Sequence, residues 1–163
     1  MKPVPLAGGP GYEERLPVFC GARTTFQIVS RMPCIESRQG IGQVVFSPLS
    51  QGILTGKYKP GQPPQAGTRA ADPNLNTFMH DLMHEKTLTA VQHLQTLAQQ
   101  GGYSLPQMAL AWVLRKQIVS AAIIGATRPQ QVEENAKAGE ITLTDDILHH
   151  IDEILGEEVT YTP

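Results

Sequence analysis

The fold of this chain is decided by the stretch Ser120-Ala-Ala-Ile-Ile-Gly-Ala-Thr-Arg-Pro-Gln-Gln-Val-Glu-Glu-Asn135. Its beginning, together with the preceding residue, is an apolar run from Val119 to Ile124 that contains β-branched residues. Such a run predicts a strand that is covered on both faces. Gly125 ends the run, and glycine is favoured where the backbone needs a positive φ or a ligand comes close. The polar residues that follow predict a helix over residues 129–138.

The turn between this strand and this helix is suited to an anion. Thr127 and Gln130 have the spacing of a capping box, and Pro129 falls in the first helical turn. A helix N-terminus presents unpaired N–H groups, and Arg128 adds a planar cation that matches phosphate. Two interpretations fit these residues: a phosphate-binding turn, or an ordinary turn with a surface arginine.

The composition is that of an ordinary globular domain. The 163 residues suffice for one buried core, and the net charge of −2 offers no basic field for nucleic acid or anionic membranes. Cys20 and Cys34 form no disulfide framework, and the first residues do not form a secretion signal. No apolar run approaches the length of a membrane span. We therefore expect a cytoplasmic protein with no nucleic-acid partner and no membrane span.

A second strand is predicted from Gln43 to Ser47, where Pro48 stops it. The following residues, 49–84, have little periodicity and are rich in Gly, Pro, Gln and Asn, so we expect a mobile loop that contributes to function. Helices are predicted over residues 85–100, 104–116, 129–138 and 144–155. Because helices separate the strands, the strands should be parallel, and they are too few to close an eight-stranded barrel.

The first part of the chain carries weaker patterns. A short helix is predicted from Tyr12 to Cys20, and Thr24 to Val29 has the composition of a strand. Met32 to Arg38 has the composition of the end of a helix, stopped by the glycines that follow.

Three motifs resemble the aldo-keto reductase family. The run from Val44 to Tyr58, VVFSPLSQGILTGKY, is similar to the family's seventh-strand motif, and Leu105 to Arg115 resembles the helix that follows. The run from Ile123 to Asn135 resembles the eighth-strand cofactor motif. The most similar branch includes the voltage-gated potassium channel β-subunits and their bacterial relatives. The resemblance implies an α/β fold that is the C-terminal portion of a (β/α)8 TIM barrel, an incomplete barrel with parallel strands and flanking helices.

This resemblance divides the chain and implies a cofactor. Residues 1–31 would be a divergent N-terminal segment, and residues 32–163 the C-terminal part of the barrel. The implied cofactor is NADP(H), with the adenosine 2′-phosphate held by Gly125, Thr127 and Arg128. The implied cofactor-binding residues are Phe46, Ser47, Pro48, Leu49, Ser50, Gln51, Gly52, Lys57, Arg69, Gly125, Thr127, Arg128, Gln131, Glu134 and Asn135.

Some of these roles have a competing interpretation. Gln131, Glu134 and Asn135 share a helix face that would meet the adenine, but Glu134 and Asn135 also fit a solvated helix surface. The family's catalytic Asp, Tyr, Lys and His lie in the first half of the barrel, and no residue of this sequence matches them. His80 and His84 have helical spacing but no third ligand, so we expect no metal site.

Three functions follow as hypotheses. The first is an NADP(H)-dependent aldo-keto reductase that acts on an aldehyde or ketone, here a truncated chain with the cofactor-binding half. The others are a non-catalytic NADP(H)-binding regulatory protein and a structural half-barrel that assembles with itself. Because a few parallel strands would leave Val44, Phe46, Ala122 and Ile124 uncovered, we expect a homo-oligomer or association with a missing half-barrel.

Overall fold

The computed structural model describes residues 42–76, 79, 82–117 and 119–158. The elements expected before Gly42, the boundary after residue 31 and His80 lie outside these residues. In chain order the elements are β1 (Gln43–Phe46), the 3₁₀ helices η1 (Ser50–Thr55) and η2 (Arg69–Ala71), α3 (Glu85–Gln100), α4 (Leu105–Leu114), β2 (Val119–Ile123), α5 (Pro129–Ala136), the 3₁₀ helix η4 (Lys137–Glu140), and α6 (Asp145–Glu158).

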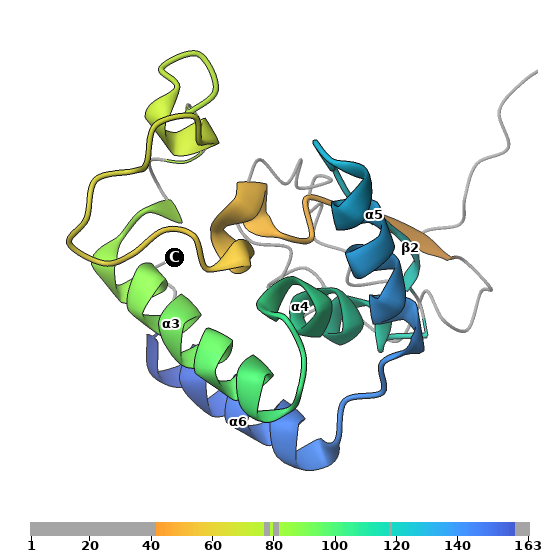
Figure 1. Ribbon diagram of the computed structural model, residues 1–163. Coiled ribbons are helices and arrows are strands. Elements are labelled where there is room, and N and C mark those ends of the chain that lie inside the picture. The colour runs from red at the N-terminus through yellow and green to blue at the C-terminus, as the bar shows by residue number, and fades with distance from the viewer. Residues whose placement is uncertain (1–41, 77–78, 80–81, 118, 159–163) are drawn as a thin grey trace, which may run out of the picture.

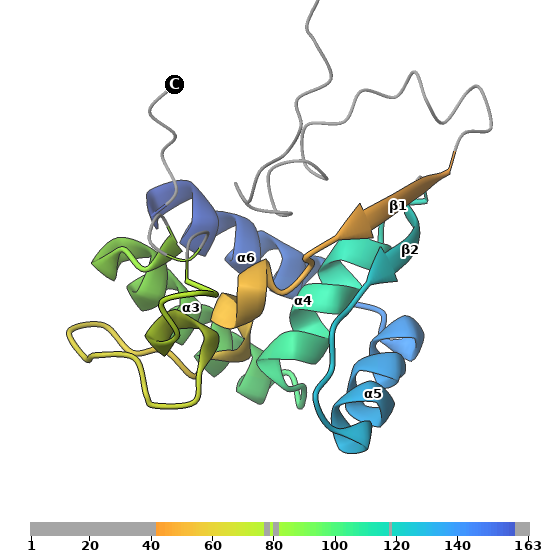
Figure 2. The ribbon, with the colours of Figure 1, turned by 90° about the horizontal axis from the view of Figure 1, so that it is seen from above.

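The two predicted strands form a parallel pair, as expected from the helices that connect them. Val45 lies beside Ala122 and Phe46 beside Ile123, and Figure 2 shows α4 alongside this pair. Since side chains alternate along a strand, Val45 and Ala122 share the face that packs on the core. Phe46 and Ile123 share the opposite face.

That opposite face is exposed, so the prediction that the strand from Val119 to Ile124 is covered on both faces is wrong. Ile123 is 60% exposed, and Val44 and Phe46 of β1 are 61% and 53% exposed. The helices cover one face of the strand pair. A strand is buried on both faces only where secondary structure packs on both sides of the sheet. Val44 and Phe46 are exposed as predicted. Ala122, by contrast, is half-buried because it points toward the helices, and Ile124 is half-buried too.

The centre of the core is α4, which lies between α3 and α5 (Figure 1). It is apolar around most of its girth, and Trp112 and Val113 are among its buried residues. The predicted capping box is present, because the Ser104 N–H donates to Gln107 Oε1 at 3.0 Å. The helix ends at Leu114, earlier than predicted, and the guanidinium of the next residue, Arg115, turns back onto the Trp112 carbonyl and ring.

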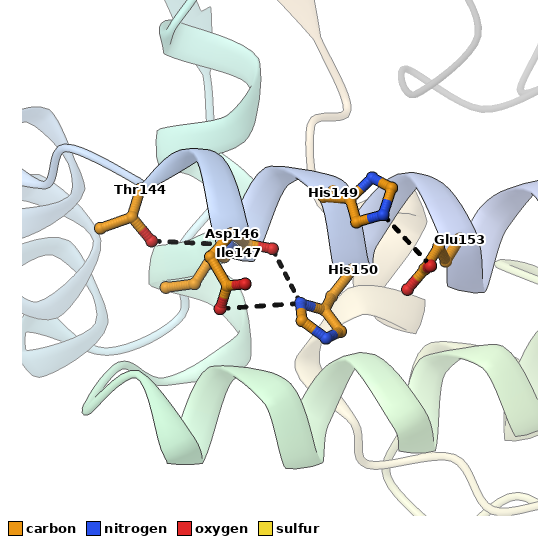
Figure 3. Close-up of polar contacts among 6 residues, drawn as sticks. All are labelled: Thr144, Asp146, Ile147, His149, His150 and Glu153. Atoms are coloured by element: carbon orange, nitrogen blue, oxygen red, sulfur yellow. Dashed lines mark hydrogen bonds and ion pairs between the residues drawn. The ribbon is translucent and has the colours of Figure 1, made fainter.

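The helices α3 and α6 lie side by side beneath this core (Figure 1). The bounds of α3 agree with the prediction, and the chain leaves it at Gly101. The N-terminus of α6 is held by Thr144, whose Oγ1 accepts the Ile147 N–H at 3.4 Å (Figure 3). The helix continues to Glu158, beyond the predicted end, and its inward residue Ile151 is 1% exposed.

The expected loop of residues 49–84 is partly built into the core. Its first part forms η1, and Ile53, Leu54 and Tyr58 are buried. Farther along, Met79 and Leu82 are buried as well. Between the buried Tyr58 and Met79, residues Lys59 to Asn76 are mostly exposed, and we call this segment the strap. Figure 1 shows the strap extending away from α4 and α5, on the side of the molecule where α3 lies.

Candidate cofactor site

A cleft of about 860 Å³ lies at the carboxyl ends of β1 and β2. Because the two strands are parallel neighbours, their carboxyl ends meet at one edge of the sheet. The turns that follow them form two walls of the cleft, and the strap forms the third. The lining residues are Phe46, Ser47, Pro48, Leu49, Gln51, Gly52, Thr55, Lys57, Gly67, Thr68, Arg69, Ala71, Asp72, Leu75, Ile123, Ile124, Gly125, Ala126, Thr127 and Gln131.

The turn after β1 has an unusual backbone. Ser47, Ser50 and Gln51 have positive φ values of 52°, 47° and 56°, a region that non-glycine residues seldom adopt. Conformations of this kind are concentrated at ligand sites. The Ser50 N–H donates to the Ser47 carbonyl at 2.9 Å, and Gln51 Nε2 donates to Ser47 Oγ at 3.0 Å. The turn is therefore held in place before any ligand arrives.

The absence of a side chain at Gly52 lets the ammonium group of Lys57 lie close to this turn. Gly52 has φ of 95°, and a Cβ at that position would lie 3.2 Å from Nζ of Lys57. The missing side chain thus leaves room for the ammonium group at the cleft wall, where it suits a phosphate oxygen. Arg69 brings a second cation from the strap, where its Nη1 donates to Gln51 Oε1. The strap also contributes one carboxylate, that of Asp72.

The turn after β2 is closed by Gln131. Its Oε1 accepts the Thr127 N–H at 2.8 Å, the Thr127 hydroxyl at 3.2 Å and the Arg128 N–H at 3.3 Å. The predicted capping pair of Thr127 and Gln130 is therefore wrong by one position. Arg128 is still extended, with φ −141° and ψ 143°, so it is the N-cap and Gln131 is its partner. The helix also ends earlier than predicted, at Ala136, and the chain continues as η4.

Most of the residues that the sequence assigns to the cofactor line this cleft. They are Phe46, Ser47, Pro48, Leu49, Gln51, Gly52, Lys57, Arg69, Gly125, Thr127 and Gln131. Four assigned residues do not line it: Ser50 is buried beneath the turn, Arg128 is exposed next to Thr127, and Glu134 and Asn135 lie farther along α5. The Glu134 carbonyl accepts Gln107 Nε2 at 3.1 Å, which joins α5 to α4.

Sequence reasoning missed several lining residues. Ile124 and Ala126 adjoin assigned positions, so their place in the cleft follows from the same motif. Thr68, Asp72 and Leu75 of the strap carry no such signal, because the strap has no periodicity. The other missed residues are Thr55, Gly67, Ala71 and Ile123.

The described residues contain no cluster of three or more His, Cys, Asp or Glu side chains that could bind a metal ion. Within the same part of the chain, every helix is too short or too polar to span a membrane. The charged groups that the cleft offers to a ligand are instead the side chains of Lys57 and Arg69, with the carboxylate of Asp72. Two cations in one cleft fit a ligand with several phosphate oxygens.

The sequence model of the Aldo/keto reductase family matches residues 31–156. The chain belongs to the aldo/keto reductase family. It is 34% identical over 119 residues to the L-glyceraldehyde 3-phosphate reductase of Escherichia coli O157:H7, which covers 72% of the chain. It is 41% identical over 124 residues, 75% of the chain, to a Schizosaccharomyces pombe protein named as a voltage-gated potassium channel subunit beta. The predicted resemblance is thus confirmed.

A solved aldo/keto reductase fold also matches. The glycerol dehydrogenase of Gluconobacter oxydans superposes with a TM-score of 0.65 at 27% identity over 84% of this chain. The match confirms the predicted fold class, a part of a (β/α)8 barrel with parallel strands and flanking helices. The chain spans about a third of the curated relatives, 34% of the reductase and 36% of the channel subunit, and 41% of the dehydrogenase.

Proposed function

We propose that this aldo/keto reductase chain binds NADP(H) in the cleft and contributes the cofactor-binding half of an oxidoreductase that reduces aldehydes or ketones. The observation that carries the proposal is the convergence of two turns, Lys57 and Arg69 at the carboxyl ends of two parallel strands. Ligands of open parallel sheets bind at this edge. We also propose a cytoplasmic location, on the ground of the cysteine usage noted above.

The proposed roles follow from the chemistry of each wall. Thr127 and Arg128, beside Gly125, would hold the 2′-phosphate, since a guanidinium can make two charge-assisted bonds to it. Lys57 and Arg69 would neutralise the pyrophosphate. The turn from Ser47 to Gln51 would contact the nicotinamide end, and Gln131, Glu134 and Asn135 the adenine. Bound NADPH would supply the hydride for the carbonyl carbon.

The reaction also needs an acid that protonates the carbonyl oxygen. No residue of this sequence matches the family's catalytic Asp, Tyr, Lys or His, so we propose that the chain alone is inactive. A non-catalytic NADP(H)-binding regulatory role is the second candidate, and the similarity to a channel β-subunit favours it. The third candidate is a structural half-barrel, which the exposed side chains of Val44, Phe46 and Ile123 favour.

Assembly would complete the barrel in any of these cases. The exposed face of β1 and β2 points away from the helices, and in a closed barrel that face is the interior. We propose that a second copy of the chain, or a separate half-barrel, covers it.

A titration of the purified chain with NADPH and NADH tests the proposal. We expect NADPH to bind more tightly, with no reduction of L-glyceraldehyde 3-phosphate, the substrate in a relative's name. Equal affinity for the two cofactors would refute the 2′-phosphate site. Turnover that survives removal of contaminating reductases would refute the inactivity. A stable oligomer that binds neither cofactor would favour the structural half-barrel.

A further inference from the structure

We propose that Tyr58 is a positioning residue whose hydroxyl holds the strap so that Arg69 reaches the cleft. This inference rests on the proposed function, since it concerns the same cofactor site. Tyr58 itself is not among the residues that line the cleft. Its ring centroid lies 5.1 Å from Nζ of the cleft residue Lys57, a contact that a phenylalanine would keep, so an effect of the hydroxyl itself would pass through the strap.

Tyr58 is a rigid anchor. Its side chain is 2% exposed and belongs to the hydrophobic core. Its carbonyl accepts Nε2 of Gln92 on α3 at 3.4 Å, and Oε1 of the same glutamine accepts Nζ of Lys59 at 2.6 Å. The chain is thus fixed to α3 at the point where the strap begins.

The hydroxyl of this anchored residue reaches the second half of the strap. It accepts the backbone N–H of Ala70 at 3.4 Å, across 12 residues of sequence. A buried tyrosine normally needs a polar partner, and here that partner is the strap itself. Tyr58 therefore connects the start of the strap, through its buried ring, with the Ala70 peptide that follows Arg69, through its hydroxyl.

Arg69 depends on this contact for its place. The guanidinium donates to Gln51, whose amide in turn donates to Ser47 Oγ at 3.0 Å. The short helix η2 that carries Arg69 has no fully buried residue, and only Ala70, which is half-buried, packs against the core. The neighbouring hydrogen bond from Ala70 to Tyr58 keeps the arginine within reach of Gln51. The contacts therefore run from Tyr58 in the core to Ala70, and from the adjacent Arg69 to Gln51 in the cleft wall.

Tyr58→Phe removes the hydroxyl and keeps the buried ring. We expect this variant of the full chain to bind NADPH roughly 3- to 10-fold more weakly, the usual net effect of one hydrogen bond. In an Arg69→Ala background the same change should have less than about a 2-fold effect, because no guanidinium remains to be positioned. Tyr103→Phe, which alters a half-buried tyrosine between α3 and α4, is the matched control and should bind as the unmodified chain does.

Amide hydrogen exchange supplies a readout without cofactor, in which Tyr58→Phe should speed exchange at Ala70 and leave α4 unchanged. An equal loss of affinity in both backgrounds would show a merely structural role and overturn the proposal. Unchanged exchange at Ala70, or unchanged affinity in Tyr58→Phe, would also overturn it. If the unmodified chain binds no NADPH, the proposed function fails, and the exchange at Ala70 then decides alone whether Tyr58 holds the strap.

Discussion

Oε1 of Gln131 accepts the backbone N–H of Thr127 at 2.8 Å, so one side chain both caps α5 and shapes the wall of the cleft. The Arg128 N–H donates to the same oxygen at 3.3 Å. These contacts hold the backbone of the turn after β2 in one conformation before any ligand binds. They also occupy the carbonyl oxygen of a glutamine that the sequence assigned to the adenine.

Replacing Gln131→Ala should loosen this turn. The bonds from Thr127 and Arg128 share one acceptor oxygen, so their loss together should lower the free energy of unfolding by about 0.5–1.5 kcal/mol, the net worth of one typical hydrogen bond. Exchange of the Thr127 and Arg128 amides should become faster. Gln130→Ala, at the exposed neighbouring position, is the control and should change stability by less than about 0.5 kcal/mol. Equal effects of the two variants would contradict the role of Gln131.

Arg128→Ala should remove most of the preference for NADPH over NADH. A charge-assisted, two-point contact to the 2′-phosphate contributes roughly 1.5–3 kcal/mol, or about 10- to 150-fold in affinity. Competitive titration of the two cofactors measures the preference. Lys137→Ala, which removes an exposed cation from η4 outside the cleft, should leave it unchanged. A preference that persists in Arg128→Ala would place the 2′-phosphate elsewhere.

The strap should be the first segment that trypsin cuts. Arg69 is exposed, whereas the core holds Tyr58 on one side and Met79 on the other. Bound NADPH should slow the cut after Arg69, because a loop that closes over a ligand is less accessible. In Arg69→Gln the early fragment should be missing. Initial cleavage after Lys116, or a rate of cleavage after Arg69 that is the same with and without NADPH, would count against closure of the strap.

The stability of α6 should depend on the protonation of His150. The main-chain carbonyl of Asp146, 2.8 Å from Nδ1, raises the pKa of His150 above its usual 6.5, and the carboxylates of Asp146 and Glu153 add to the shift while desolvation opposes it (Figure 3). Because the folded-state pKa is the higher one, the stabilisation is complete below the unfolded value and is lost as the pH rises through the folded value.

Comparison with His150→Gln isolates this contribution. The difference in unfolding free energy between the unmodified chain and the variant should be largest below the usual pKa of 6.5 and should shrink as the pH rises through the higher folded-state pKa. His93→Gln, an exposed change on α3, serves as the control. A difference that stays constant as the pH rises, or an NMR titration of His150 at or below its usual pKa, would contradict the prediction.

Substitution of Val44 should weaken assembly through the exposed sheet face. This side chain is 61% exposed on β1 and lies outside the cleft. Val44→Asp puts a charge on the apolar face and should shift light scattering toward the monomer. Val132→Asp places the same charge at a valine of α5 that is 52% exposed, and should leave the assembly intact. A monodisperse monomer of the unmodified chain at high concentration would exclude this interface.

The helices were predictable because their signals are local. The bounds of α3 follow from apolar residues at helical spacing and from the glycines after them. The capping box of Ser104 and Gln107 also follows from spacing alone. Spacing predicted neither the end of α4 at Leu114 nor the stacking of Arg115 on Trp112 beside it.

Much of the candidate site was predictable for a similar reason. The turns after β1 and β2 carry glycine and proline in fixed positions, and the family motifs depend on those positions. The strap is different, because its lining residues Asp72 and Leu75 belong to no periodic pattern. The shift of the cap from Thr127 to Arg128 was missed because two adjacent glutamines satisfy the same spacing rule.

By itself the sequence determined the parallel order of the strands, the course of the main helices and the two turns that line the cleft. These features depend on backbone preferences and on residues only a few positions apart. Only the tertiary structure decided which face of β1 and β2 is bare, and that Arg69 meets Gln51 from 18 residues away. Exposure and long-range contacts depend on what lies opposite each side chain, and that is set by the packing of the whole chain.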